Sequence, residues 1–266
     1  MKSELQKIGI QLLWIIFLLF THVLFSYYKY LHGWWCSSIG TVLILLLCYL
    51  NWNKDCLRIA GLNLNFKIVV KSIFATAIVI VISLLLMKDI AEKHNVSIMH
   101  ISKWMDYYHD VFYILNEEIV FGSLVLFYLT QKRKIIPIYA SVGLALLFSA
   151  IHFAFYRWII DIGIVQIATL ITLFLIGFVR NNLIIVNGHI GYSWALHFGW
   201  IVIMFGFIHQ NNDTQMIMSE LDTFNYYLGS IEALVISFAL AAVSCVYCLK
   251  RTAFQEQHLK PKRKIF

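Results

Sequence analysis

The sequence predicts an all-α fold, a polytopic transmembrane helix bundle of about eight spans with a polar site in its core. The first observation is composition: 61% of the 266 residues are hydrophobic and only 13% are charged, with a mean hydropathy of +0.76. Soluble domains are about half apolar and about a quarter charged. The second is that apolar runs near the roughly 20 residues of a membrane span recur along the chain. The third is that a few ionisable side chains stand alone inside these runs, which makes each a functional hypothesis.

Eight apolar segments are the expected spans. In chain order they are Ile8–Phe25, Trp34–Leu50, Ile68–Met87, Val111–Leu129, Ile135–Phe155, Trp158–Val179, Ile190–Ile208 and Ser230–Leu249. Several are flanked by Trp or Tyr, which favour the membrane–water interface. The first segment has no small-residue cleavage site before its polar end, so we expect it to remain as an anchor. The second is short for a span, and local thinning of the bilayer would accommodate it.

The connectors divide the chain into three parts. Residues 1–107 hold the first helices and an outer connector, residues 108–208 the expected catalytic core, and residues 209–266 the last span and a basic cytoplasmic tail. In the outer connector, Met99–Tyr113 alternates apolar and polar groups at helical spacing, so we expect either an amphipathic helix on the outer leaflet or a solvated connector. The run Lys260–Lys264 predicts a surface patch that meets anionic membrane lipid.

The distribution of positive charge predicts the orientation. With eight spans and the N-terminus inside, the inner segments hold 16 of the 21 lysines and arginines, Arg180 among them, and the outer segments hold 5. Inner loops of membrane proteins carry this excess. We therefore expect an integral protein of the cell membrane, of bacterial type, with both termini in the cytoplasm. The same clustering between apolar runs argues against nucleic acid as the reason for the net charge of +7.

Polar side chains within three of the spans form the candidate site. Glu117 and Glu118 lie in the fourth, where one acidic side chain costs at least about 2.5–3.5 kcal/mol on insertion scales. His152 and His197 lie in the fifth and seventh. At 1.5 Å per residue, Glu117 and His152 stand about 20 and 26 Å from the cytoplasmic ends of their helices, so they reach similar depth. The convergence of His197 with them is left open by the spacing.

These residue types suit water activation. A carboxylate beside a histidine in a water-poor pocket can hold and deprotonate a water molecule, and a second histidine can stabilise an oxyanion. The alternative is structural, with Glu118 pinning helix ends and each histidine bonded locally. The matched depth favours the functional interpretation.

Three motifs resemble those of a known family. The segment Asn116–Gly122 resembles the Glu-Glu-x-x-x-Arg motif of the CPBP family, the CAAX-protease and bacteriocin-processing membrane proteins. Phe148–His152 is similar to its Phe-x-x-x-His motif, and Trp194–Trp200 to its His-x-x-x-Asn motif. Order and spacing agree over a stretch from about Tyr108 to Ile208.

The resemblance implies an intramembrane endopeptidase acting on a membrane-bound or lipidated peptide. It implies that Glu117 is the general base, that His152 helps to hold the attacking water, that His197 helps to stabilise the oxyanion, and that Glu118 supports the site. Glutamate-based catalysis without an obligate metal is the expected mode. Zinc held by Glu117, His152 and His197 is the alternative.

Two positions depart from the family motifs. Gly122 stands in place of the motif arginine, which removes the usual charge partner of the glutamates, and Ile201 stands in place of the motif asparagine. Loss of one oxyanion donor typically lowers the rate by about 10²–10³. Asn182, Asn187, His189 or Tyr192 are candidates to replace it. The departures leave two alternatives to hydrolysis open: acyl transfer in lipoprotein modification, or a catalytically degenerate protein with a binding or immunity role.

Overall fold

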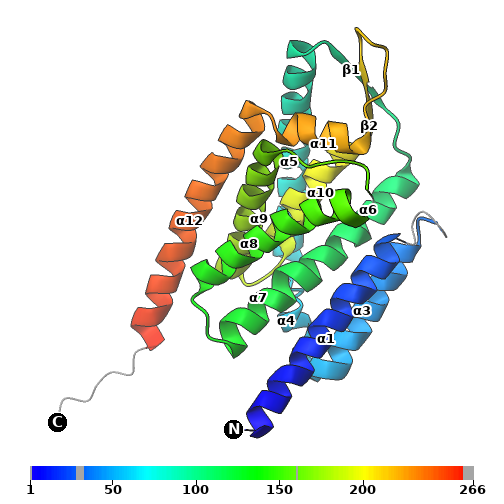
Figure 1. Cartoon of the computed structure of the whole chain (residues 1–266). Helices are drawn as coiled ribbons and strands as arrows, with labels where there is room; N and C mark the ends of the chain where they lie inside the picture. Colours follow the sequence, from blue (N-terminus) through cyan, green and yellow to red (C-terminus); the bar gives the residue numbers. More distant parts are fainter. Residues whose placement is uncertain (1, 28–32, 160, 260–266) are drawn as a thin grey trace.

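The computed structural model describes residues 2–27, 33–159 and 161–259 and is a helix bundle with one short hairpin (Figure 1). Six helices are long and apolar enough to cross a membrane, and two more, Gly9–Phe25 and Gly191–Phe205, are apolar but shorter. The predicted all-α class is confirmed at this level. Each of the eight expected segments overlaps one of these helices, while the number of helices that cross a membrane stays a prediction.

The elements follow one another with few long connections. In chain order they are α1 (Lys2–Tyr27), α3 (Cys36–Trp52), η1 (Asn53–Asp55), α4 (Cys56–Ile59), α5 (Phe66–Lys93), β1 (Val96–His100), α6 (Trp104–Glu117), η2 (Glu118–Leu124), α7 (Val125–Phe127), η3 (Tyr128–Lys132), α8 (Pro137–Ala154), η4 (Phe155–Ile159), α9 (Ile167–Asn187), α10 (Gly191–Phe205), β2 (Phe207–Asn211), α11 (Glu220–Leu228) and α12 (Ile231–Leu259).

Local chemistry sets several helix ends. The side chain of Asn65 accepts a hydrogen bond of 2.9 Å from the Ile68 amide and so caps α5. Pro137 begins α8, where its missing N–H has no helical partner to lose.

The expected start of the sixth span at Trp158 is wrong by nine residues: α9 begins at Ile167. Trp158 belongs instead to η4, which continues α8.

The outer connector holds a strand where a surface helix was one of the two expectations. Val96–His100 pairs antiparallel with Phe207–Asn211, with Val96 opposite Asn211 and His100 opposite Phe207. A separate amphipathic helix starting at Met99 is therefore wrong. Helical structure starts only at Trp104 and runs on without a break into the fourth span. The backbone N–H and C=O groups of this segment form hydrogen bonds with a strand more than 100 residues away. The local sequence pattern does not predict such a distant partner.

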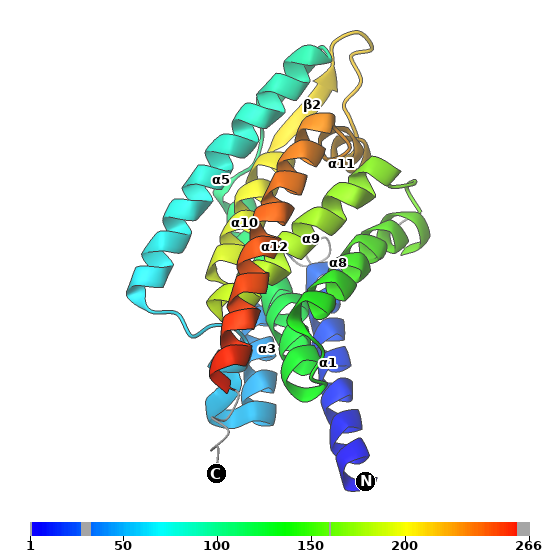
Figure 2. The ribbon, with the colours of Figure 1, turned by 90° about the vertical axis from the view of Figure 1, so that its left-hand side faces the viewer.

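Helix packing brings the central spans together. α5 packs against α10, α8 against α9, and α9 against α12, while α1 and α3 lie beside α6 (Figures 1 and 2). The contact between α5 and α10 depends on Gly199. A Cβ there would lie 2.9 Å from the Val79 side chain and 3.1 Å from the Thr76 carbonyl oxygen. Only a residue without a side chain permits this approach.

Both ends of the described chain lie at the same end of the bundle, opposite the hairpin (Figures 1 and 2). α4 and the turn between η3 and α8 lie at that end as well. The expected patch Lys260–Lys264 falls outside the described residues.

The hairpin holds a histidine away from water. His209 in β2 is 2% exposed, its Nε2 lies 3.4 Å from the Met87 sulfur, and its ring packs on Tyr227 at a centroid distance of 4.8 Å. Burial lowers the pKa of His209 to about 4. The neutral imidazole is thus the form that fits this packing.

We expect Gly199→Ala to lower the melting temperature of the purified protein, because the added methyl must displace the Thr76 backbone. Overpacking of this kind typically costs about 1–3 kcal/mol. The control is Gly143→Ala on α8, where a Cβ would meet nothing within 4 Å. Thermal unfolding in detergent measures both variants, and equal melting temperatures would contradict the close contact.

We expect the protein to lose stability as pH falls from 6.5 towards 4. The pKa of His209 is lower in the folded state than in the unfolded state, so between these two values the unfolded chain binds a proton that the folded chain does not. The contribution of His209 to the free energy of unfolding therefore declines as the pH falls below 6.5 and is lost near 4. His209→Gln should flatten the dependence of melting temperature on pH in this window. His94→Gln, at an exposed position, is the control that should leave it unchanged. A wild-type slope in His209→Gln would show that other groups cause the loss.

Candidate active site

The two adjacent glutamates lie where α6 passes into a π-helical segment. α6 ends at Glu117, and η2 begins at Glu118. Both side chains are buried, with 6% of Glu117 and 0% of Glu118 exposed. π-Helical turns inside α-helices occur frequently at functional sites. The two carboxylates contact different neighbouring helices.

Glu117 forms a buried ion pair with Arg180 of α9. The Arg180 Nη1 donates to the Glu117 Oε1 at 2.8 Å and lies 3.6 Å from the Glu118 Oε1. Arg180 is 2% exposed. The prediction that Arg180 belongs to an inner loop is therefore wrong. Without it, 15 rather than 16 lysines and arginines remain in the inner segments. A buried carboxylate needs a cation at contact distance, and α9 carries that cation to it.

Arg180 takes the part that the motif arginine was expected to play. A Cβ on Gly122 would already lie 2.7 Å from the Ile184 side chain and 3.3 Å from a Glu118 carboxylate oxygen, so this position has no room for a long side chain. The glutamates thus have a charge partner after all, from a different helix. The sequence signal was Arg180 itself, a lone cation directly after an apolar run.

Glu118 is held by two side chains of α10. The Glu118 Oε1 lies 2.9 Å from the His197 Nδ1, and its Oε2 accepts a hydrogen bond from the Ser193 hydroxyl. Ser193 and His197 stand four residues apart, so they share one face of the helix. The spacing had left the convergence of His197 with the glutamates open, and the structure places its ring in direct contact with the Glu118 carboxylate.

His152 lies beside the pair without bonding to either carboxylate in the described part of the chain. Its Nδ1 donates to the Phe148 carbonyl oxygen at 2.8 Å. Its ring stacks on Phe224 of α11 at a centroid distance of 5.9 Å. The Phe148 ring contacts the His152 ring at 4.5 Å and lies 4.3 Å from the Arg180 guanidinium carbon. The Phe148 ring therefore contacts both His152 and Arg180.

Several polar atoms remain for a water or a substrate. Among the described residues, the Glu117 Oε2 and the Nε2 atoms of His152 and His197 make no hydrogen bond, and the buried Arg180 Nε has none either. Within the described residues, the hydrogen bonds join Glu117 to Arg180 and Glu118 to His197, and none joins Glu117 to either histidine.

Another member came from a helix that sequence analysis did not connect with the site. His22 of α1 is 4% exposed. Its ring stacks on Tyr113 at 5.5 Å and meets the Phe121 ring edge-on at 6.2 Å, so it faces the turn that carries Glu117. With Phe224, His22 shows that residues from 1–107 and 209–266 also contact the centre of 108–208. The adjacent polar residues Thr21 and His22 inside an apolar run were a local signal.

The candidates to replace the motif asparagine bond elsewhere. Asn182 accepts from Ser141 and donates to Ser244, and the Asn187 amide donates to the Leu183 carbonyl oxygen. The His189 Nδ1 accepts from the Gly191 amide, and its ring packs on Tyr192. In the part of the chain that the structure describes, none of these hydrogen bonds or ring contacts involves Glu117 or Glu118.

The zinc alternative gains no support from the geometry. Within the ranges that the structure describes, no three His, Cys, Asp or Glu side chains are grouped so that they could hold a metal ion.

The fold and the site together define a class: a helical protein whose described residues include six helices long and apolar enough to cross a membrane, with a charged cluster buried among its helices. The chain matches no protein-family model, no curated protein and no solved structure.

We expect Arg180→Met to destabilise the protein by about 3–5 kcal/mol, because it leaves a buried carboxylate without its cation. The double variant Glu117→Gln with Arg180→Met should recover part of this loss, since no charge stays unpaired at that contact. Thermal unfolding of both in detergent gives the comparison.

The exposed ion pair between Arg157 and Asp161, at 3.1 Å, provides the control. Its side chains are 45% and 80% exposed, so Arg157→Met should change stability by less than about 1 kcal/mol. Equal effects of the two single substitutions would mean that the Glu117–Arg180 contact is not a buried pair.

Proposed function

We propose that this chain is a CPBP-like integral membrane endopeptidase, which hydrolyses a membrane-bound or lipidated peptide with a water activated by Glu117. The observation that carries the proposal is the unequal bonding of the two carboxylates. Glu118 has both oxygens bonded, to His197 and Ser193, and is fully buried. Glu117 has one oxygen on Arg180 and the other free of hydrogen bonds within the described residues.

This difference suggests separate roles. The free oxygen of Glu117 is the one that can accept a proton from water, as a general base must within hydrogen-bond reach. Glu118 orients His197 through Nδ1, which leaves Nε2 of that ring for the substrate. The proposed mechanism uses His197 with an N–H on each ring nitrogen, one donated to Glu118 and the other directed to the substrate.

The reaction would run as follows. Water attacks the peptide carbonyl carbon and gives one proton to Glu117. The resulting oxyanion accepts a hydrogen bond from the Nε2–H of His197. The C–N bond then breaks, and the proton on Glu117 passes to the leaving amine. His152 lies beside Glu117 and helps to hold the water through its free Nε2.

The proposed setting is the cell membrane, with eight spans and both chain ends in the cytoplasm. It is supported by the charge excess that remains after Arg180 is removed from the count, and by the position of both described ends opposite the hairpin. The two shorter apolar helices count as spans in this proposal, and membrane lipid and a membrane peptide are the expected partners.

A degenerate, non-catalytic protein is the second candidate. The observation in its favour is that Arg180 neutralises Glu117 directly and that Ile201 offers no oxyanion donor. The cluster would then hold helices together while another surface binds a partner. Lipoprotein acyl transfer has no separate observation in its favour.

The test is mass spectrometry of membrane peptides and lipopeptides from cells with and without the chain. We expect shortened peptides with the wild type and a loss of about 10²-fold or more in their formation with Glu117→Gln, which is typical of removing a general base. Glu92→Gln, at an exposed position on α5, should retain the wild-type yield. Altered acyl groups would favour transfer, and an unchanged profile would favour the non-catalytic candidate.

A further inference from the structure

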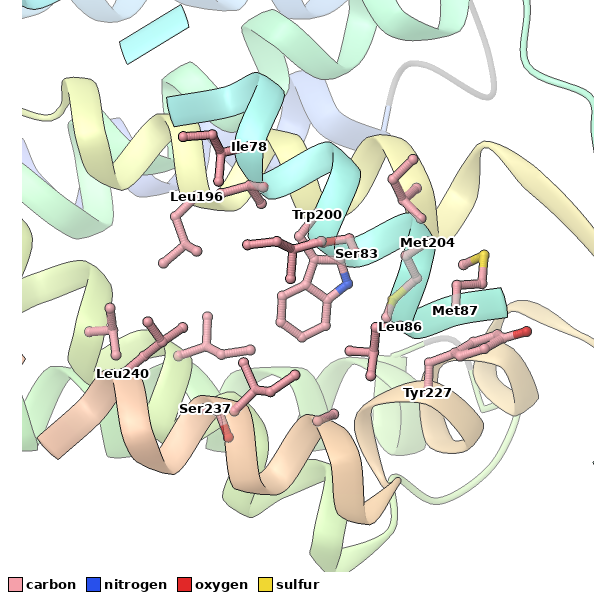
Figure 3. Close-up of a pocket in the computed structure, with 17 residues that line it drawn as sticks. Ile78, Ser83, Leu86, Met87, Leu196, Trp200, Met204, Tyr227, Ser237 and Leu240 are labelled. Atoms are coloured by element: carbon pink, nitrogen blue, oxygen red, sulfur yellow. The ribbon is translucent and has the colours of Figure 1, made fainter. Parts of the chain in front are cut away.

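A cavity of about 320 Å³ lies between α5, α9, α10 and α12. Figure 3 shows the Trp200 indole projecting into the space between α5 and α12. Apart from the hydroxyls of Ser83, Ser237 and Tyr227 and the indole N–H, the lining side chains are hydrocarbon or thioether. The volume is about twice that of an apolar cavity of about 150 Å³ which stays dry and takes up benzene.

The cavity runs along the helices as a slot. Its α5 wall extends from Ile78 to Met87, about 13 Å at the helical rise, and its α12 wall from Ala233 to Leu240, about 10 Å. One leaflet accounts for about 15 Å of a hydrocarbon core about 30 Å thick. The slot therefore has the direction and length of an acyl chain in a single leaflet.

The mouth of the slot opens between two helices that face the surroundings of the bundle. Ile78, Ile82 and Leu240 line it and are 45%, 49% and 42% exposed. In a membrane these side chains contact lipid tails. Water has no partners there beyond a few hydroxyls, so an apolar occupant is favoured.

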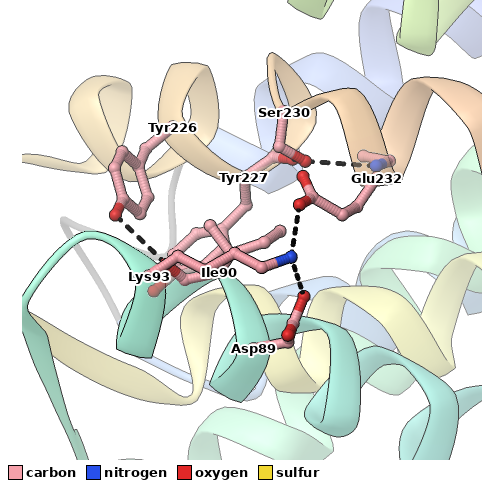
Figure 4. A network of polar contacts seen from close by, with 8 residues as sticks. Asp89, Ile90, Lys93, Tyr226, Tyr227, Ser230 and Glu232 are labelled. Atoms are coloured by element: carbon pink, nitrogen blue, oxygen red, sulfur yellow. Dashed lines mark hydrogen bonds and ion pairs between the residues drawn. The ribbon is translucent and has the colours of Figure 1, made fainter.

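Polar contacts close the slot at the hairpin end. The Lys93 ammonium bridges Asp89 on its own helix at 2.7 Å and Glu232 of α12 at 2.8 Å (Figure 4). The Tyr226 hydroxyl donates to the Ile90 carbonyl oxygen at 3.5 Å. These charged groups mark the depth at which hydrocarbon ends, and they tie α5 to α12 just beyond Met87 and Ala233.

We propose that the slot binds one acyl chain of a membrane phospholipid from the leaflet on the hairpin side. The inference rests on the membrane setting of the proposed function and is independent of hydrolysis. Leu196 and Val179 line the slot and are the sequence neighbours of His197 and Arg180. The bound chain therefore packs against the same two helices that hold the polar site.

The test uses the full chain in phosphatidylcholine vesicles with and without brominated acyl chains, whose bromine atoms quench tryptophan fluorescence on contact. The fluorescence of Trp200 is obtained by subtracting the emission of Trp200→Phe from that of the wild type. We expect brominated lipid to quench it. Ser83→Phe, which fills the slot, should lose this quenching, while Leu85→Phe, at a 63% exposed position on the same helix, should keep it.

The outcomes separate the proposals. Absence of Trp200 quenching in the inserted wild type, or equal quenching in Ser83→Phe and Leu85→Phe, would overturn the lipid site alone. Failure of the wild type to insert into the vesicles would overturn the membrane setting and with it the proposed function.

Native mass spectrometry of the wild type from detergent is the second measurement, and it needs no substitution. A retained phospholipid mass supports the proposal. A free fatty acid, or no added mass, overturns it.

Discussion

The Glu117–Arg180 ion pair is the contact on which the centre of this protein depends. Two neighbouring carboxylates are buried among apolar helices, where an unpaired charge costs several kcal/mol. Arg180 meets this requirement from α9, and its guanidinium is in turn covered by the Phe148 ring of α8. Three helices therefore have to stay in register around one charge pair. Their relative positions then decide where every other polar group of the site lies.

The bonding around this pair divides the two carboxylates into a held group and an available one. Ser193 and His197 occupy both oxygens of Glu118, so that residue works best as an orienting anchor. Glu117 keeps one oxygen without a hydrogen bond among the described residues. Adjacent residues in the sequence thus have different environments because the helices packed against them differ, which is a general way to separate the properties of two like groups.

α10 connects the polar site with the apolar slot. One face carries Ser193 and His197 to Glu118, while the adjacent face carries Leu196 and Trp200 to the space beside α5 and α12. Gly199 lets this helix approach α5 at all. A change in what fills the slot would press on the helix that orients His197, so lipid and site share a structural element.

The sequence by itself determined the helical class and the apolar helices, because a helix satisfies its backbone internally and a candidate span needs only length and apolarity. It also marked Glu117, Glu118, His152 and His197, since ionisable groups stand out in apolar runs. Tertiary structure alone decided that Arg180 pairs with Glu117, that His22 packs against Tyr113 from α1, and that Val96–His100 pairs as a strand. Those outcomes depend on partners more than 60 residues away, and no local pattern records which distant side chain will arrive.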